Sequence, residues 1–243
     1  MGDPRGLPYL NQAVKELDVK SQTDDLAAAT AFLGRYYHYH ARHMKAIEYL
    51  EQARSLAEPI GNPQTLQTIY GHLSGAYQHL AQLNRSDEWA RKTILLGEDK
   101  NHLLAQATGH EFLAESAICR GDWDESLRQT AKNRELADKM GALNRQAWSE
   151  YPRTMALWGK GRLAEAYQVA QTALDLCERI GETRLASWIE PALVLIATDL
   201  NEDEAAERYA REGLRRGQSL GQVALHGYSL HAMGYWHMRR LEW

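Results

Sequence analysis

The stretch AIEYLEQARSLAEPIG, residues 46–61, decides the fold of this chain. It is an amphipathic helical pattern that begins at the small residue Ala46 and ends at Gly61. The same pattern recurs with a period of 40 residues. Counting forward by 40 from Ala46 gives a row of small residues: Ser86, Ser126, Ala166 and Ala206. Counting forward by 40 from Gly61 gives a row of Asn or Gly: Asn101, Gly141, Gly181 and Gly221. A fixed period of this kind is typical of an all-α helical repeat protein.

The period divides the chain into helix pairs. Each repeat is expected to form two antiparallel helices, with a left-handed residue closing the second one. The turns between the helices of a pair are predicted at Ala41, Ala81, Gly121, Gly161 and Asn201. Full repeats are predicted at 22–61, 62–101, 102–141, 142–181 and 182–221, with partial repeats at 1–21 and 222–243. The partial repeat at the start should hold a second helix at 8–18. The expected architecture is a single right-handed superhelical solenoid of antiparallel helix pairs over residues 1–243.

The segment LGRYYHYHARHMKAIEYLEQA, residues 33–53, resembles the tetratricopeptide repeat. The residues that match its pattern are Leu33, Gly34, Tyr37, Ala41, Ala46, Leu50 and Ala53, with a looser copy at Leu73, Ser74, Tyr77, Ala81, Ser86, Ala90 and Thr93. The usual repeat of that family has about 34 residues. The 40-residue form is similar to the repeats of large bacterial regulators of the maltose-activator type and of signalling ATPases and cyclases. This resemblance implies a module that binds a partner or senses a ligand, often inside a longer polypeptide.

Composition excludes several classes of function. The net charge of -4 and the scattered Lys and Arg residues argue against direct binding of nucleic acid. The longest apolar run, Ala192 to Ala197, is too short for a membrane span, and no secretion signal is seen at the start. Cys119 and Cys177 have no metal-ligand spacing, which favours a reducing, cytoplasmic setting without a disulfide. We expect no cofactor, no metal and no catalytic activity.

The aromatic residues give the one compositional hint of a recognition surface. The chain has 12 Tyr and 7 Trp against 2 Phe. In tetratricopeptide proteins the first helices line a concave groove, and the resemblance places these residues there: Arg35, His38, Tyr39, Gln78, His79, Glu111, Glu115, Trp148, Tyr151, Met155, Trp158, Trp188, Tyr228 and Tyr235. The set Trp148, Tyr151, Met155 and Trp158 has helical spacing and should share one face. The alternative is that each ring packs against the next first helix. For the whole set we favour a ligand surface.

A second anomaly is a charge in the apolar stripe. Arg153 stands in the row of Leu33 and Leu73, and one turn earlier that stripe holds His110, Glu150 and Glu190. Charges at packed positions must be paired. We therefore expect Arg153 to be largely buried and paired with Glu150, Glu190 or both. An ion pair that fixes packing is the first interpretation and a polar ligand pocket the second. A catalytic or metal site is the third, because no nucleophile, phosphate loop or ligand motif accompanies the cluster.

Two further features are ambiguous. The run RYYHYHARHM contains His38, His40 and His43, but the spacing lacks a fourth ligand, so a solvated helix end is favoured over a zinc site. The terminal helix at 222–243 should leave Met233, Trp236 and Trp243 uncovered. Such a patch predicts a homodimer formed through these residues.

Two functions remain open from the sequence. The first is a non-catalytic protein- or peptide-binding scaffold, a fragment of a larger regulatory or signalling protein. The alternative is the sensor domain of a transcription regulator that takes a polar, carbohydrate-like small molecule. An open extended groove would favour the scaffold. A cluster of Trp148, Trp158 and Trp188 around Arg153 would favour the sensor.

Overall fold

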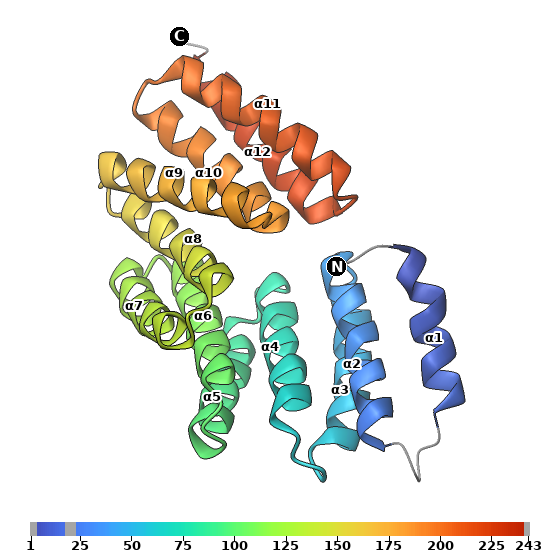
Figure 1. The fold of residues 1–243 in the computed structure, drawn as a ribbon. Coiled ribbons are helices and arrows are strands. Elements are labelled where there is room, and N and C mark those ends of the chain that lie inside the picture. Colours follow the sequence, from blue (N-terminus) through green and yellow to red (C-terminus); the bar gives the residue numbers. More distant parts are fainter. Residues whose placement is uncertain (1–3, 18–22, 241–243) are drawn as a thin grey trace. The chain divides into compact units, whose positions relative to one another are not determined.

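The computed structural model describes residues 4–17 and 23–240, and within these ranges every regular element is a helix (Figure 1). A short 3₁₀ helix, η1 (Pro4–Gly6), comes first. The α-helices are α1 (Leu7–Glu16), α2 (Thr23–Tyr39), α3 (His43–Ala57), α4 (Pro63–His79), α5 (Leu83–Asp99), α6 (Leu103–Arg120), α7 (Trp123–Met140), α8 (Leu143–Gly159), α9 (Leu163–Ile180), α10 (Thr183–Asp199), α11 (Asp203–Ser219) and α12 (Val223–Arg240). The predicted all-α class of antiparallel helix pairs is confirmed.

The turns lie at the positions that the sequence predicts. From α3 onward each helix begins 20 residues after the one before. The residue two positions before each of these starts has a positive φ, between 49° and 75°: Ala41, Gly61, Ala81, Asn101, Gly121, Gly141, Gly161, Gly181, Asn201 and Gly221. At most of these turns the next residue donates its N–H to the carbonyl five positions earlier, as Gln82 does to Tyr77 at 2.9 Å. This bond satisfies carbonyls that the helix end leaves open, so each turn is a helix cap as well as a connection.

Small residues set the distance between the two helices of a pair. The small row predicted from the sequence is fully buried, with 0% exposure at Ala46, Ser86, Ser126, Ala166 and Ala206. In the first pair, a Cβ added to Gly34 would lie 2.5 Å from Leu50 Cγ and 3.2 Å from the Ala46 carbonyl oxygen. At the equivalent place in the next pair, the Ser74 hydroxyl donates to the Ser86 carbonyl at 2.8 Å. Close packing therefore depends on these positions staying small.

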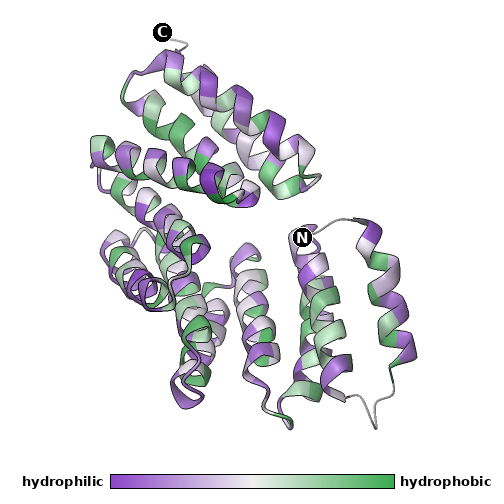
Figure 2. Ribbon diagram, viewed as in Figure 1, coloured by the Kyte–Doolittle hydropathy of each residue, from purple (hydrophilic) through white to green (hydrophobic). Residues whose placement is uncertain are grey.

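Contacts group the chain into two compact units, residues 1–116 and 117–243, hereafter unit 1 and unit 2. The core of unit 1 includes Leu50, Ile69 and Leu73. The core of unit 2 centres on α10, in which every residue from 189 to 198 is buried and which Figure 2 shows as largely apolar. The expectation of one continuous solenoid over the whole chain stays a prediction. No helix in the described part of the chain is long and apolar enough to cross a membrane.

The first testable consequence concerns backbone strain at the turns. Ala81 holds a φ of 57°, where its Cβ is crowded at a cost of about 1–2 kcal/mol. Glycine removes that strain but gives the unfolded chain more freedom, which offsets part of the gain. We expect Ala81→Gly to raise the free energy of unfolding by about 0.5–1 kcal/mol, measured by urea denaturation. Ala28→Gly, inside α2, is the control and should lower it by about 1 kcal/mol. Equal losses in both variants would refute the strain account.

Candidate binding surface

Three successive first helices of unit 2 carry an aromatic ring at the same repeat position. These rings are Trp148 on α8, Trp188 on α10 and Tyr228 on α12, each 40 residues after the last and each half-buried. The Trp188 ring lies between Tyr151 and Tyr228, with centroid distances of 5.6 and 5.4 Å. The Tyr228 hydroxyl points to the Met155 sulfur at 3.9 Å. We call Trp148, Tyr151, Trp188 and Tyr228 the aromatic row, and it connects all three helices.

Asp199 organises the far end of this face. It is the last residue of α10, and its carboxylate accepts hydrogen bonds from Trp158 Nε1 at 2.7 Å and from the Tyr235 hydroxyl at 2.6 Å. Burial and the bond to Asp199 raise the pKa of Tyr235, so this hydroxyl remains a donor at neutral pH. Trp158 is half-buried and packs against the core of unit 2, as the rings of the aromatic row also do, and its indole N–H is directed to Asp199. Its place on the ligand surface stays a prediction.

A cation lies at the opposite end of the same face. The Arg184 guanidinium, in the first turn of α10, lies 4.6 Å from the centroid of the Trp148 ring. At this distance the positive charge is attracted to the face of the indole. The surface therefore has a basic group at the start of α10, the aromatic row in the middle and a hydrogen-bonded carboxylate at the end.

The predicted site residues fall into two sets, one in each unit. Unit 1 holds the polar set: Arg35, His38 and Tyr39 on α2, Gln78 and His79 on α4, and Glu111 and Glu115 on α6. Two of these are buried, His38 at 9% exposure and Glu111 at 8%. Arg35 lies over the Phe32 ring of its own helix at 4.6 Å. All the predicted Trp and Tyr residues except Tyr39 lie in unit 2.

The three adjacent histidines do not form a solvated helix end as expected. His38 is buried, and His43 meets it with 5.5 Å between ring centroids. His40 turns away and stacks on Tyr36 at 4.0 Å, with its Nδ1 donating to the Tyr36 carbonyl at 2.8 Å. Across the described ranges, no three His, Cys, Asp or Glu side chains are arranged to hold a metal ion.

The expected burial of Arg153 is wrong. Its side chain is 42% exposed, and its guanidinium pairs with Glu150 at 3.2 Å. Glu150 also accepts a hydrogen bond from Arg134 of α7. Because Arg134 helps to compensate the charge of Glu150, Arg153 can remain partly in water. His110, the fourth member of the predicted cluster, is half-buried on α6 in unit 1.

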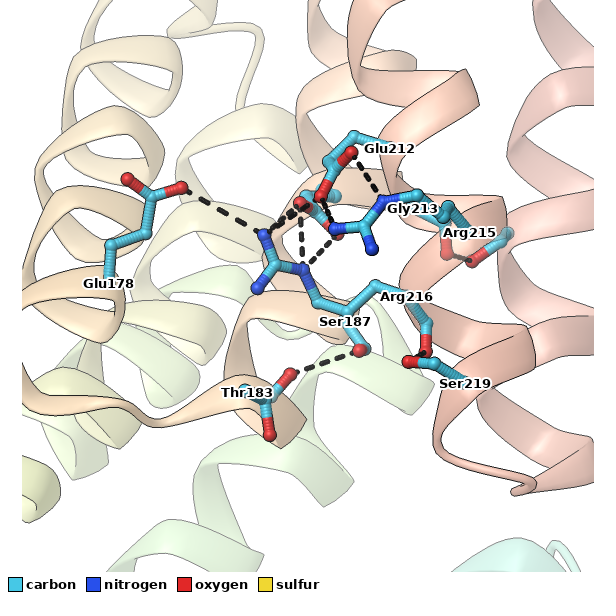
Figure 3. A network of polar contacts seen from close by, with 10 residues as sticks. Glu178, Thr183, Ser187, Glu212, Gly213, Arg215, Arg216 and Ser219 are labelled. Carbon is cyan, nitrogen blue, oxygen red and sulfur yellow. Dashed lines mark hydrogen bonds and ion pairs between the residues drawn. The ribbon is translucent and has the colours of Figure 1, made fainter.

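Glu190 is buried, but its partner is Arg216 on α11 rather than Arg153. Figure 3 shows Arg216 with its other neighbours Glu212 and Glu178. Glu190 is 1% exposed, and its two carboxylate oxygens lie 3.0 and 3.1 Å from Arg216 Nε. Arg216 Nη2 also lies 3.4 Å from Glu212 and 3.9 Å from Glu178. Gly213 lets α11 approach, since an added Cβ would lie 3.3 Å from the Glu190 Cβ. The ion pair thus joins α10 to α11.

The terminal helix α12 is better covered than expected. Trp236 is 3% exposed and donates its indole N–H to Asp203 of α11 at 3.1 Å, so it does not contribute to an open patch. Met233 is half-buried, and Trp243 lies outside the described residues.

Sequence patterns did not identify three residues that prove important in the structure, Asp199, Arg184 and Arg216. Asp199 could have been noticed, because an acidic residue at a helix C-terminus opposes the helix dipole and needs a compensating partner. Arg184 and Arg216 resemble many exposed basic residues of the chain, and only tertiary contacts distinguish them.

The comparisons with known proteins support the fold. No protein-family model matches the sequence, and no curated protein matches it. Solved structures do match. A Rap protein complexed with the competence and sporulation factor has a TM-score of 0.76 and 13% identity, over 97% of this chain and 69% of that one. A signal-transduction ATPase from Pyrococcus horikoshii with a tetratricopeptide repeat sensor has a TM-score of 0.63 and 14% identity, over 98% and 39%. Kinesin light chain repeats from Podosopora anserina, described as tetratricopeptide-like, have a TM-score of 0.55 and 16% identity, over 84% and 99%.

The buried pair gives a pH-dependent prediction. Burial raises the pKa of Glu190 from 4.5 to about 7, and Arg216 opposes that rise. A carboxyl with a raised folded pKa contributes stability that is present below about pH 4.5 and lost as the pH rises through the folded pKa. Arg216→Met should therefore cost about 3–5 kcal/mol at pH 8 and clearly less at pH 5, measured by chemical denaturation. Adding Glu190→Leu should restore most of the loss at pH 8. A loss independent of pH, or no recovery in the double variant, would contradict the pairing.

The contact at Asp199 gives a second prediction. Trp158→Phe keeps most of the ring volume and removes the indole N–H, leaving Asp199 one donor short. Because this hydrogen bond has a charged acceptor, we expect a loss of about 1.5–3 kcal/mol in the free energy of unfolding. Trp148→Phe is the matched control, because the contact that the structure shows for the Trp148 ring is with the Arg184 cation. This variant should lose less than about 1 kcal/mol in the free energy of unfolding. Similar losses in both variants would count against the Asp199 contact.

Proposed function

We propose that this chain, which has the tetratricopeptide-like helical-repeat fold, is a non-catalytic scaffold that binds a protein or peptide on the first-helix face of unit 2. The observation that carries the proposal is the aromatic row. Trp148, Trp188 and Tyr228 repeat at one position in three successive first helices, and each is only half-buried.

The chemistry of this face suits a peptide. Large rings give much contact area at little loss of rotamer freedom, and rings of this kind are enriched among residues that dominate binding energy. Arg184 and Asp199 lie at opposite ends of α10, so a bound chain would meet a positive group and a negative group on either side of an apolar centre. This arrangement favours an amphipathic segment with an apolar side chain at its middle.

The small-molecule alternative loses its expected support. It required Trp148, Trp158 and Trp188 to gather around Arg153. Instead, the three indoles have separate partners: Arg184, Asp199, and the pair Tyr151 and Tyr228. We therefore keep the scaffold as the proposal.

The chain matches only part of some larger proteins. It spans 39% of the signal-transduction ATPase and 69% of the Rap protein. We propose that it serves as a partner-binding module of a regulatory or signalling protein. Cys119 is exposed and Cys177 buried, and no disulfide joins them, which fits a reducing, cytoplasmic setting. Self-association through residues 222–243 now depends on fewer apolar side chains, because Trp236 is buried.

The test starts from a random peptide library displayed on phage and selected against the whole chain. The affinity of a selected peptide is then measured by calorimetry for the native protein and for variants. Trp188→Ala should weaken binding about 30-fold, which corresponds to about 2 kcal/mol. Tyr167→Ala, which removes a half-buried ring from the second helix α9, is the matched control and should change the affinity less than about threefold.

Thermal melting of each variant shows whether the fold persists, and Trp188→Phe provides a milder change if the alanine variant melts early. If no peptide is selected, or if the α9 variant weakens binding as much as the α10 variant, the proposal is wrong.

A further inference from the structure

Unit 1 contains a cluster of four histidine rings contributed by three helices. His38 near the end of α2 lies with its ring centroid 5.5 Å from His43, 5.4 Å from His72 and 5.3 Å from His79. The rings of His43 and His79 are stacked at 4.7 Å. His43 is the first residue of α3, and His72 and His79 lie two turns apart on α4. We call these four residues the histidine cluster.

A glycine makes room for the cluster. Gly75 lies on α4 between His72 and His79, and a Cβ added there would be 3.0 Å from His38 Cε1 and 2.9 Å from Phe112 Cε1 of α6. The His38 ring therefore packs directly on the backbone of α4, and His38 is only 9% exposed. The Nδ1 atom of His43 is buried without a hydrogen-bond partner.

The helix that carries two of the four rings has no charged side chain other than those histidines, because the sequence of α4 contains no Asp, Glu, Lys or Arg. Burial lowers the pKa of His43. Burial and the neighbouring His43 also lower the pKa of His79, but His79 is exposed to water, which limits the lowering. Tyr39 on α2 contacts the cluster directly, with its ring centroid 5.6 Å from His38 and 5.5 Å from His72. The other titratable and charged groups on the neighbouring helices include Arg35 on α2, Arg42 and Lys45 at the start of α3, and His110, Glu111 and Glu115 on α6.

We propose that the histidine cluster makes the packing of α2, α3 and α4 sensitive to mild acid, so that protonation loosens the first two helix pairs while unit 2 stays folded. Four imidazoles within contact distance cannot all carry a charge without repulsion, and opening the helices lets them be solvated. A histidine with a lowered folded pKa contributes stability that is present above about pH 6.5 and lost as the pH falls toward the folded pKa. The proposal is independent of the proposed binding function.

The test is hydrogen exchange of the whole chain at pH 7.5 and 5.5, corrected for the chemical exchange rate. Protection of α2 to α4 should fall in acid by up to about tenfold for each histidine that opening exposes. The region from α9 to α11 contains no histidine, and its protection should stay constant or rise as Glu190 is protonated. Equal losses of protection in both regions would overturn the proposal.

Variants isolate the cluster. His43→Gln with His79→Gln should remove most of the acid response of α2 to α4. His231→Gln, an exposed histidine on α12, is the matched control and should leave that response unchanged. Because the double variant could fold poorly, the ring pKa values of the native protein are also measured by NMR. Values below 6 for at least two rings of the cluster support the proposal, and fewer than two such rings overturn it.

Discussion

The left-handed residue that closes each helix from α2 to α11 is the constraint on which the structure depends. Ten such residues stand 20 positions apart, from Ala41 to Gly221, so the helices have nearly equal lengths and their faces stay in register. This register places one small residue from the second helix of each pair at the point where it crosses the first helix, and these residues are fully buried. Because positive φ strains any residue with a Cβ, glycine holds six of these positions.

Repetition leaves some positions free to differ from one repeat to the next, and both unusual clusters occupy such positions. In unit 2 the rings of Trp148, Trp188 and Tyr228 fall in line because they share a repeat position. In unit 1 the histidine cluster combines unequal positions from three helices, and it depends on the space above Gly75. Regular register therefore produces the first cluster, and local packing produces the second.

Buried charge shows how the same repeat position acquires different partners. Glu150 and Glu190 are 40 residues apart and both are buried. Glu150 is met by Arg134 from the preceding second helix, whereas Glu190 is met by Arg216 from the following one. Each carboxylate needs a guanidinium because an unpaired buried charge is very costly, but the repeat itself does not specify which neighbour supplies it.

The sequence by itself determined the all-α class, the 40-residue period, the positions of the turns and the small crossing residues. These features depend on local backbone preference and on side-chain size, which each segment carries with it. It also indicated that Trp148, Tyr151 and Trp188 belong together. Only the tertiary structure decided that Trp158 reaches Asp199, that Arg153 is exposed, that Arg216 pairs with Glu190 and that His72 joins His38. Those contacts join different helices, and the direction in which a long side chain turns depends on neighbours that the periodic pattern does not specify.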